Sequence, residues 1–365
     1  MHKYFRYENN QFTEHSELPC GYIKPTKDCL VLSIMEDSSR PKVERIGLFI
    51  KKQNIEIVYL DFISVESYID VNTYKRLEAE LSGFNFKILT VNLLNCQFES
   101  HIFFPLHALQ LRENFSNDNF PEANRFIQWN VLKTKKRLKK YLFLNHHMRT
   151  ERFKIFESLY NNNNLDNGLV SFNWTLDNKR FNNVNYDVSD SDIKYILNSP
   201  AYNVLPLMLD GDINAEYEFD NNIKHIANPV FFQPQNTNAT HFYNSYFEII
   251  TEGFSARTPF HPYADRSNIL HYSEKIYKPL FFMNPFSFWG PENTLEQFSK
   301  YFGFSFECPL YHCNNDAYDL NAFCKKIKEF ADLSYSDLHG IYYDNFEEFE
   351  HNRNTLISYL NNIHL

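Results

Sequence analysis

Glycine is scarce in this chain, and the phosphate-binding motifs that depend on it are missing. Only 9 of the 365 residues are Gly, and neither a G-x-G-x-x-G turn nor a Walker loop occurs. Long apolar runs are missing too, since no segment approaches the roughly 18 apolar residues of a membrane span. The N-terminal MHKYFRYENN lacks the apolar core of a secretory signal. We therefore expect a cytoplasmic protein without a membrane span.

Cysteine is infrequent and dispersed. Six cysteines in a chain of this length do not form the dense framework of a disulfide-stabilised domain, so we expect free thiols in a reducing cytoplasm. Cys308, His312 and Cys313 are close in sequence, but no second ligand pair with zinc spacing accompanies them. The sequence therefore predicts neither a metal site nor a bound cofactor.

Positive charge is also in deficit. The net charge of −9 and the pI near 5.9 argue against a general nucleic-acid coat, whose footprint is a strong positive excess. A local basic face is still compatible with these values, and KTKKRLKK (133–140) is a candidate for it. This run fits either a patch that follows DNA phosphates or the solvated face of a helix at a domain hinge.

The composition is that of a folded protein that is long enough for two domains. Hydrophobic residues make up 43% of the chain and charged residues 22%, as in globular proteins, and 365 residues exceed one ordinary core. Apolar runs rich in β-branched and aromatic residues alternate with helical stretches, which is the pattern of α/β layers. We predict an N-terminal α/β domain over 1–125, a C-terminal α/β domain over 126–335, and a helix over 336–365 that could pack back on the N-terminal domain.

The predicted elements follow from this rhythm. In the N-terminal domain we expect strands at 29–35, 45–50, 55–63, 86–94 and 101–109, and a helix at 67–84 that ends at Gly83. In the C-terminal domain we expect a helix that ends in the basic run, strands at 141–145, 168–174, 245–251 and 285–290, and helices at 150–160, 273–283, 293–304, 319–333 and 345–360.

The segment HYSEKIYKPLFFMNPFSFWG (271–290) places polar residues directly ahead of an apolar stretch. Ser273 is a good N-cap, Glu274 falls in the first helical turn, and we expect the helix to break at its proline. Lys275 and Lys278 are three residues apart and share one face of that turn. A helix N-terminus with two lysines suits an anion, and a nearby carboxylate suits a ribose diol. An ordinary capped helix with a solvated first turn is the alternative.

The segment FLNHHMRTER (143–152) joins a strand to a helix. Arg149 and Arg152 flank Thr150, a candidate N-cap, so both guanidinium groups can point past the helix end. Such groups bind phosphate oxygens in pairs. Exposed arginines on a surface helix are the alternative interpretation.

The segment SYFEIITEG (245–253) ends in an acidic residue. Alternation places Glu248 and Glu252 near the end of a strand, and ligands of open α/β sheets bind beyond the carboxyl ends of the strands. Glu252 can therefore face a bound sugar. The alternative is a solvent-facing loop glutamate.

Together these three segments resemble a known family. The succession SxFEIITE, a spacer, SEKIYKPLFFMNPFSFWG and a Leu-Glu helix ending in GF is similar to the C-terminal domain of GT-B glycosyltransferases, with the fucosyltransferase-like Ser/Thr-Glu-Lys helix. The FLN-x-x-x-R-x-x-R segment is also similar to glycosyltransferase-like proteins of tailed phages and bacteria. The resemblance covers residues 141–175 and 243–305. Met283-Asn284 stands where the family usually has a glycine.

The resemblance implies two Rossmann-like domains that face a cleft (GT-B type), with a nucleotide-sugar in the C-terminal half, inside a bacterium or a phage-infected host cell. It assigns Arg149 and Arg152 to the diphosphate, Glu274 to the ribose, Lys275 or Lys278 to a phosphate and Glu252 to the transferred sugar, with Asn145 and Ser273 completing the nucleotide-binding set.

The resemblance also implies that the reaction needs no metal, because positive side chains and a helix dipole stabilise the departing nucleoside diphosphate. If the reaction inverts, a base from the N-terminal domain deprotonates the acceptor hydroxyl. The candidate bases are Asp37, Glu99, His101 and His107.

Two rival functions stay open. In LPLMLDGD (205–212), Asp210 and Asp212 resemble the DxD of GT-A glycosyltransferases, whose carboxylates hold Mn²⁺ or Mg²⁺ on the nucleotide-sugar, but DGD is also ordinary turn chemistry. The other rival is a non-catalytic carbohydrate-binding protein with aromatic stacking platforms, although its aromatics are dispersed. The acceptor stays open between a glycan, a lipid and a hydroxymethylated DNA base, and the oligomeric state is undetermined.

Overall fold

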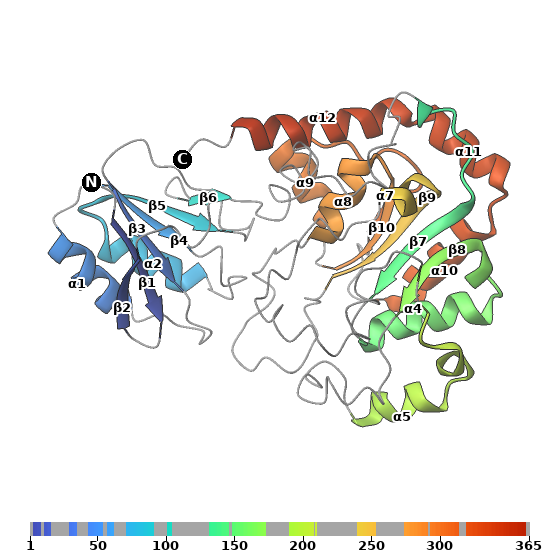
Figure 1. The fold of residues 1–365 in the computed structure, drawn as a ribbon, viewed down its shortest axis with the longest axis horizontal. Helices are drawn as coiled ribbons and strands as arrows, with labels where there is room; N and C mark the ends of the chain where they lie inside the picture. The colour runs from blue at the N-terminus through green and yellow to red at the C-terminus, as the bar shows by residue number, and fades with distance from the viewer. Residues whose placement is uncertain are drawn as a thin grey trace. The chain divides into compact units, whose positions relative to one another are not determined.

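The chain forms two compact units, one within Met1–Leu106 and the other within His107–Phe260 and Ser273–Asn362. A computed structural model describes residues 3–8, 11–15, 29–34, 43–53, 57–61, 71–90, 101–103, 131–145, 148–172, 190–207, 209, 239–252, 274–290, 293–313 and 319–362 (Figure 1). Each unit contains one sheet in which parallel pairing dominates, which confirms the α/β prediction.

The first unit is a six-stranded sheet with the order β2-β1-β3-β4-β5-β6. Only β1 and β2 pair antiparallel, and the other described pairs are parallel. Ile46, Ile50, Leu77 and Leu81 of the helical segments pack with the strands in one buried core. The elements are β1 (Lys3–Glu8), β2 (Gln11–His15), β3 (Leu30–Ile34), α1 (Val43–Gln53), β4 (Ile57–Asp61), α2 (Val71–Glu80), β5 (Asn85–Thr90) and β6 (His101–Phe103).

The predicted strand at 45–50 is wrong, because this segment lies inside α1. Ile46 and Ile50 are one helical turn apart and fully buried, whereas Leu48 between them is 57% exposed. A strand would have turned all three side chains to the same face. The short apolar run does not reveal this, since its composition fits a strand as well as a buried helix.

The second unit is a five-stranded parallel sheet with the order β11-β10-β9-β7-β8. The chain starts at β7, steps to β8 at one edge and then crosses to β9 on the other side of β7. The strands are β7 (Lys139–Asn145), β8 (Gly168–Phe172), β9 (Ser245–Thr251), β10 (Phe286–Trp289) and β11 (His312–Cys313). The helices are α4 (Thr150–Asn161), α5 (Asp190–Asn198), α7 (Ala239–Tyr243), α8 (Glu274–Phe282), α9 (Thr294–Phe302), α10 (Leu320–Asp332), α11 (Tyr335–Asp344) and α12 (Phe346–Asn362), with 3₁₀ turns at Leu165–Asn167 and Pro200–Val204.

Helices cover both faces of this second sheet (Figure 1). On one face α10 packs through Phe330 against Phe247 of β9, with ring centroids 5.8 Å apart. On the other face α11 packs through Tyr342 against Tyr246 of β9, at 6.3 Å. The crossovers β7-α4-β8 and β9-α8-β10 run in opposite directions, and right-handed connections therefore put α4 and α8 on opposite faces. The unit is a doubly wound layer.

The C-terminal segment forms two helices that pack within the second unit. We expected a helix over 336–365 that could pack back on the N-terminal domain, and the structure shows that α12 lies along α8 and α9 of its own unit. Its Arg353 guanidinium lies 5.3 Å from the ring centroid of Phe281 in α8, and Tyr359 packs on Phe302 of α9. Its buried Asn352 bonds both the N–H and the carbonyl of Ser305. The apolar stripe of α12 is therefore covered by its own unit.

We predicted that a helix ends in the basic run 133–140, and this prediction is wrong. The run forms a turn and then enters β7 at Lys139. Four of its cations donate to main-chain carbonyls: Lys135 to Tyr243 (2.9 Å), Arg137 to Ser245 (2.6 Å), Lys139 to Asp166 (2.6 Å) and Lys140 to Ala331 (2.7 Å). The run therefore fastens the start of β7 to neighbouring elements, and it offers few cations to an external phosphate backbone.

Arg137 is the central residue of the hydrogen bonds that join the start of β7 to neighbouring elements. Its side chain is 4% exposed, its Nη1 also donates to Asn284 Oδ1 at 2.9 Å, and its guanidinium lies 3.7 Å from the ring centroid of Tyr342. We expect Arg137→Ala to lower the free energy of unfolding by about 3–5 kcal/mol, since it leaves buried acceptors without a donor and opens a cavity. Thermal unfolding should shift by roughly 10 °C. The exposed neighbour Lys136 is the control, and a Lys136→Ala shift of equal size would contradict the prediction.

Candidate functional site

The strand order of the second sheet reverses between β7 and β9. Loops on the two sides of such a reversal leave in opposite directions, and ligands of open α/β sheets bind there, beyond the carboxyl ends of the strands. In the first unit the described parallel strands β1, β3, β4, β5 and β6 follow one another without a reversal. The candidate site therefore belongs to the carboxyl edge of the second sheet.

Asn145, the last residue of β7, meets Thr251, the last residue of β9, at this reversal. The Thr251 hydroxyl donates to Asn145 Oδ1 at 2.9 Å, and Thr251 also pairs in register with Trp289 at the end of β10. All three side chains are at most 4% exposed. The three residues form one row across the ends of three adjacent strands, which we call the edge row.

Arg152 of α4 extends the edge row. Its Nε donates to Thr251 Oγ1 at 3.1 Å, and its Nη2 donates to the Thr251 carbonyl at 3.3 Å. The side chain is 4% exposed, so the alternative of an exposed surface arginine is wrong for this residue. The N-cap of α4 is Arg149 rather than Thr150. Arg149, which is half-buried, therefore lies at the start of the helix. The side chain of Arg152 instead contacts the sheet at Thr251.

Glu252 directly follows the edge row. Its backbone N–H donates to the Trp289 carbonyl at 2.9 Å, which continues the ladder one residue past β9. The residue is 4% exposed, which excludes the solvent-facing alternative. Alternation along β9 places Glu252 on the side of Glu248, the face that carries α8, opposite Thr251. Glu248 pairs in register with Phe286 inside the sheet, so it lies away from the edge.

Helix α8 brings further predicted residues toward the same edge. Because α8 connects the parallel strands β9 and β10, it runs back across the sheet, and its first turn points to the carboxyl edge. Glu274 is its first residue, and Lys275 and Lys278 are half-buried. The helix does not break at Pro279, which lies inside it. The lost N–H of a proline removes one backbone bond, and packing on α12 holds the helix together.

Met283-Asn284, where the family that the sequence resembles usually has a glycine, lie at the opposite end of α8. Met283 adopts a φ of 57°, the left-handed conformation that glycine favours. Asn284 is fully buried, and its amide donates to the Phe242 carbonyl and to Ser245 Oγ at the start of β9. This turn is therefore at the amino edge of the sheet, and the lack of glycine there does not obstruct a ligand at the carboxyl edge.

Gly290, after β10, has no room for a side chain. A Cβ would lie 2.3 Å from the buried Phe288 ring and 3.3 Å from Glu252 Cβ. We expect Gly290→Ala to lower the free energy of unfolding by roughly 1–3 kcal/mol. Gly340→Ala in α11 is the matched control: it has no atom within 4 Å of its Cβ and should gain up to about 1 kcal/mol. Urea unfolding measures both, and a neutral Gly290→Ala would contradict this geometry.

The other predicted residues are not brought to the edge by the described part of the chain. His101 begins β6 in the first unit. Cys308 and Cys313 are buried, and His312 stacks on Phe323. Burial raises the pKa of Cys308 to about 12 and lowers the pKa of His312. Ser273, Asp37, Glu99, His107, Asp210 and Asp212 lie outside the described residues.

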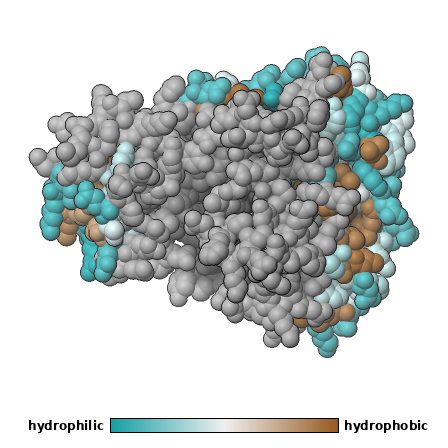
Figure 2. Space-filling model, viewed as in Figure 1, coloured by the Kyte–Doolittle hydropathy of each residue, from teal (hydrophilic) through white to brown (hydrophobic). Residues whose placement is uncertain are grey.

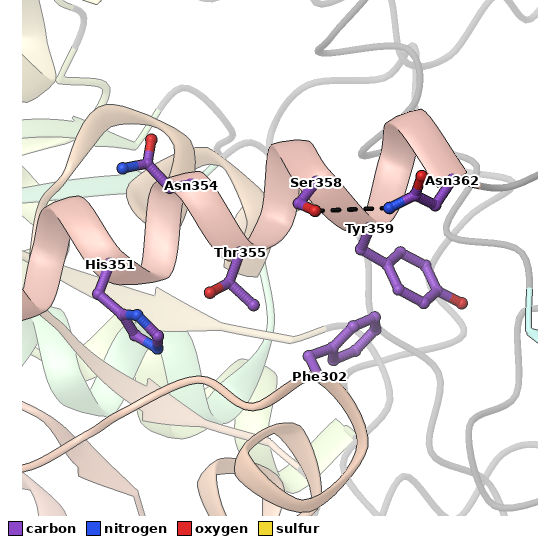
Figure 3. A pocket seen from close by; sticks show the side chains of 7 residues that line it. All are labelled: Phe302, His351, Asn354, Thr355, Ser358, Tyr359 and Asn362. Carbon is purple, nitrogen blue, oxygen red and sulfur yellow. Dashed lines mark hydrogen bonds between the residues drawn. The ribbon is translucent and has the colours of Figure 1, made fainter.

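A surface hollow of about 470 Å³ lies between α9 and α12 (Figure 3). Its described lining contains hydroxyls, amides and two aromatic rings but no Lys or Arg. In Figure 3, Thr355 and Tyr359 point to the same side of α12 as Phe302. A phosphate would meet no Lys or Arg in this lining. The lining residues are Phe302, His351, Asn354, Thr355, Ser358, Tyr359 and Asn362.

The described surface and helices give two further facts. On the face shown in Figure 2, hydrophilic residues cover most of the described surface, with smaller hydrophobic patches between them. None of the helices formed by described residues combines the length and apolarity needed to cross a bilayer. The same residues contain no cluster of three or more His, Cys, Asp or Glu side chains placed to hold a metal ion.

Comparison with known proteins found no match: no protein-family model, curated protein or solved structure is significantly similar to this chain.

Sequence reasoning missed two residues of the edge row, Thr251 and Trp289. Thr251 gives no signal because threonine is common in strands. Trp289 gives none because it is the last aromatic residue of an apolar run. Their position at the last residue of a predicted strand could have indicated both, because the chain leaves the sheet directly after each of them.

Proposed function

We propose that this protein is a glycosyltransferase of the GT-B type, which binds a nucleotide-sugar at the carboxyl edge of the second sheet and transfers the sugar to a hydroxyl acceptor. The observation that carries the proposal is the buried hydrogen-bonded group of Asn145, Thr251 and Arg152 at the strand reversal, with Glu252 next to it. A buried cation at a switch point is costly to maintain, and anion binding is a function that justifies it.

The arrangement suits a diphosphate leaving group. Helices α4 and α8 begin toward the same edge from opposite faces, and each N-terminus contributes a partial positive charge. Arg149 and Arg152 add full charges on one side, and Lys275 and Lys278 add them on the other. As the sugar–phosphate bond breaks, negative charge moves onto the nucleoside diphosphate, and these fixed groups stabilise it. No step in this scheme requires a metal.

Glu252 is assigned to the sugar. The anomeric carbon gains positive character while it exchanges its bond to the diphosphate oxygen for a bond to the acceptor oxygen. A carboxylate on the α8 side of the edge stabilises that charge, as carboxylates do in other glycosyl transfers. The acceptor proton goes to a separate base or to solvent.

The acceptor is proposed to be a glycan or a lipid-linked sugar. The alternative of a modified DNA base rested on the basic run 133–140, and four of those cations donate to main-chain carbonyls of the protein itself. The run therefore gives no support to DNA as a partner.

Thermal-shift measurements with UDP-, GDP-, CMP- and dTDP-sugars test the proposal. We expect one nucleotide class to raise the unfolding temperature, since a ligand that binds only the folded state stabilises it by mass action. Nucleoside diphosphate release in the presence of EDTA is then measured. Stabilisation by free sugars alone would favour the carbohydrate-binding alternative, and abolition by EDTA with rescue by Mn²⁺ would favour the GT-A alternative.

A further inference from the structure

Two buried N–H groups of the edge row have no hydrogen-bond partner within the part of the chain that the structure describes. They are the side-chain amide Nδ2 of Asn145 and the indole Nε1 of Trp289. The two residues are 4% and 3% exposed. Buried donors in folded proteins are nearly always satisfied, and each unsatisfied one costs enough to require an explanation.

Both groups belong to the same place in the fold. Thr251 pairs with Trp289 in the β9–β10 register and is hydrogen-bonded to Asn145 across β7–β9. Parallel neighbours in register turn their side chains to the same face, so the two orphan donors flank Thr251 on the face that carries α4 and α10. The contact between Trp289 and Phe323 of α10, with centroids 5.4 Å apart, places the indole on that face.

The groups of the edge row that lack a partner are donors, because its acceptors are already used. Asn145 Oδ1 accepts from Thr251, and both oxygens of Thr251 accept from Arg152. Two N–H groups are left to face a ligand, next to the positive charge of the Arg152 guanidinium that bonds Thr251. The complementary group is one that only accepts and carries negative charge, which is the chemistry of phosphoryl oxygens.

We propose that Trp289 is a ligand-binding residue, and that its indole N–H and the amide N–H of Asn145 donate to the diphosphate oxygens of the nucleotide-sugar. This inference rests on the proposed function and sharpens it, because it assigns direct hydrogen bonds to the diphosphate on the α4 side of the edge, while Lys275 and Lys278 of α8 contribute charge from the other side. A diphosphate has oxygens on two phosphorus atoms, and it therefore spans more than one strand end.

Indole N–H resonances give a direct test. The chain has three tryptophans, Trp129, Trp174 and Trp289, so a nitrogen-15 spectrum shows three indole cross-peaks, which Trp129→Phe and Trp174→Phe assign by elimination. Inorganic pyrophosphate, UDP and GDP are titrated in turn. We expect the Trp289 peak to shift with pyrophosphate and with the nucleotide that binds, and to be unmoved by uridine or guanosine.

Trp289→Phe supplies the matched variant, because it keeps an aromatic ring against Phe323 and removes only the N–H and part of the ring system. We expect its affinity for the nucleoside diphosphate to fall roughly tenfold, as for one hydrogen bond to a charged group. Asn145→Asp, which replaces the donor with a carboxylate oxygen, should cause a larger fall.

The outcomes separate this inference from the proposed function. If a nucleotide-sugar binds and the Trp289 peak does not move, the inference is overturned and the glycosyltransferase proposal stands. A shift with nucleosides alone would assign the row to the base and overturn the diphosphate assignment. If pyrophosphate moves the peak but no nucleotide binds, the anion site is supported and the glycosyltransferase proposal fails. The wild-type titration decides these cases even if Trp289→Phe does not fold.

Discussion

Glu252→Gln is expected to lower the turnover number roughly 100- to 1000-fold while the affinity for the nucleoside diphosphate changes little. The magnitude is that of removing one preorganised electrostatic group from a water-poor site. Glutamine has the same shape, so the backbone bond from Glu252 to the Trp289 carbonyl is kept. The loss should fall on the step in which charge develops on the sugar, and much less on ground-state binding.

Steady-state kinetics and nucleotide titration measure the two parts separately. Glu296→Gln is the matched control, because Glu296 is an exposed residue in the first turn of α9 and should leave both values within twofold. A large drop in nucleotide affinity with unchanged turnover would contradict the role of Glu252 and would place its carboxylate on the ribose. Unchanged kinetics would remove Glu252 from the site altogether.

Most strands and helices of the second unit were predictable because their apolar periods are long and their ends are marked, but α5, α7 and β11, and α11 as a separate helix, were not predicted. The predicted strand at 245–251 matches β9, and the predicted helix at 319–333 contains α10. Here Asp319 accepts from two backbone N–H groups as the N-cap, which is the signal that the sequence shows. In these two elements the local period, and for α10 the N-cap, agree with the final structure.

The failures have a common cause, which is that composition does not distinguish geometries of equal apolarity. The run at 45–50 is a helix because burial falls on Ile46 and Ile50 and not on Leu48. The basic run 133–140 enters a strand because main-chain carbonyls from other parts of the chain accept hydrogen bonds from its side chains. Those acceptors are distant in sequence, so no local pattern could predict them.

The charged residues of the candidate site and Asn145 were predicted from the sequence, whereas Thr251 and Trp289 were not. Arg152 and Glu252 could be predicted because each is a charged residue near the end of a predicted element. Both are buried at the strand reversal. Thr251 and Trp289 join them only because the register aligns β9 with β10. Register depends on pairings between distant segments, so the edge row required the folded sheet.

Arg152→Lys is expected to weaken catalysis although it keeps the positive charge. The guanidinium makes two separate bonds to Thr251, from Nε to the hydroxyl and from Nη2 to the carbonyl. A lysine ammonium is a single point of charge and cannot reproduce the planar fork, so it holds either Thr251 or a phosphate oxygen. We expect kcat/KM to fall roughly 10- to 100-fold and the free energy of unfolding to fall by about 1–2 kcal/mol.

A comparison of Arg152→Lys with Arg149→Lys separates the effect of Arg152 on nucleotide binding from its effect on stability. Arg149 is half-buried at the N-cap of α4, so its replacement should weaken nucleotide binding with a smaller loss of stability. Arg45→Lys, on the exposed surface of α1, should change neither quantity. Because both site variants keep their charge, a loss of activity cannot come from the long-range field and must come from the geometry of the guanidinium. Full kcat/KM in Arg152→Lys would show that the fork is not needed, and the diphosphate would then have to bind on the lysine side of the edge.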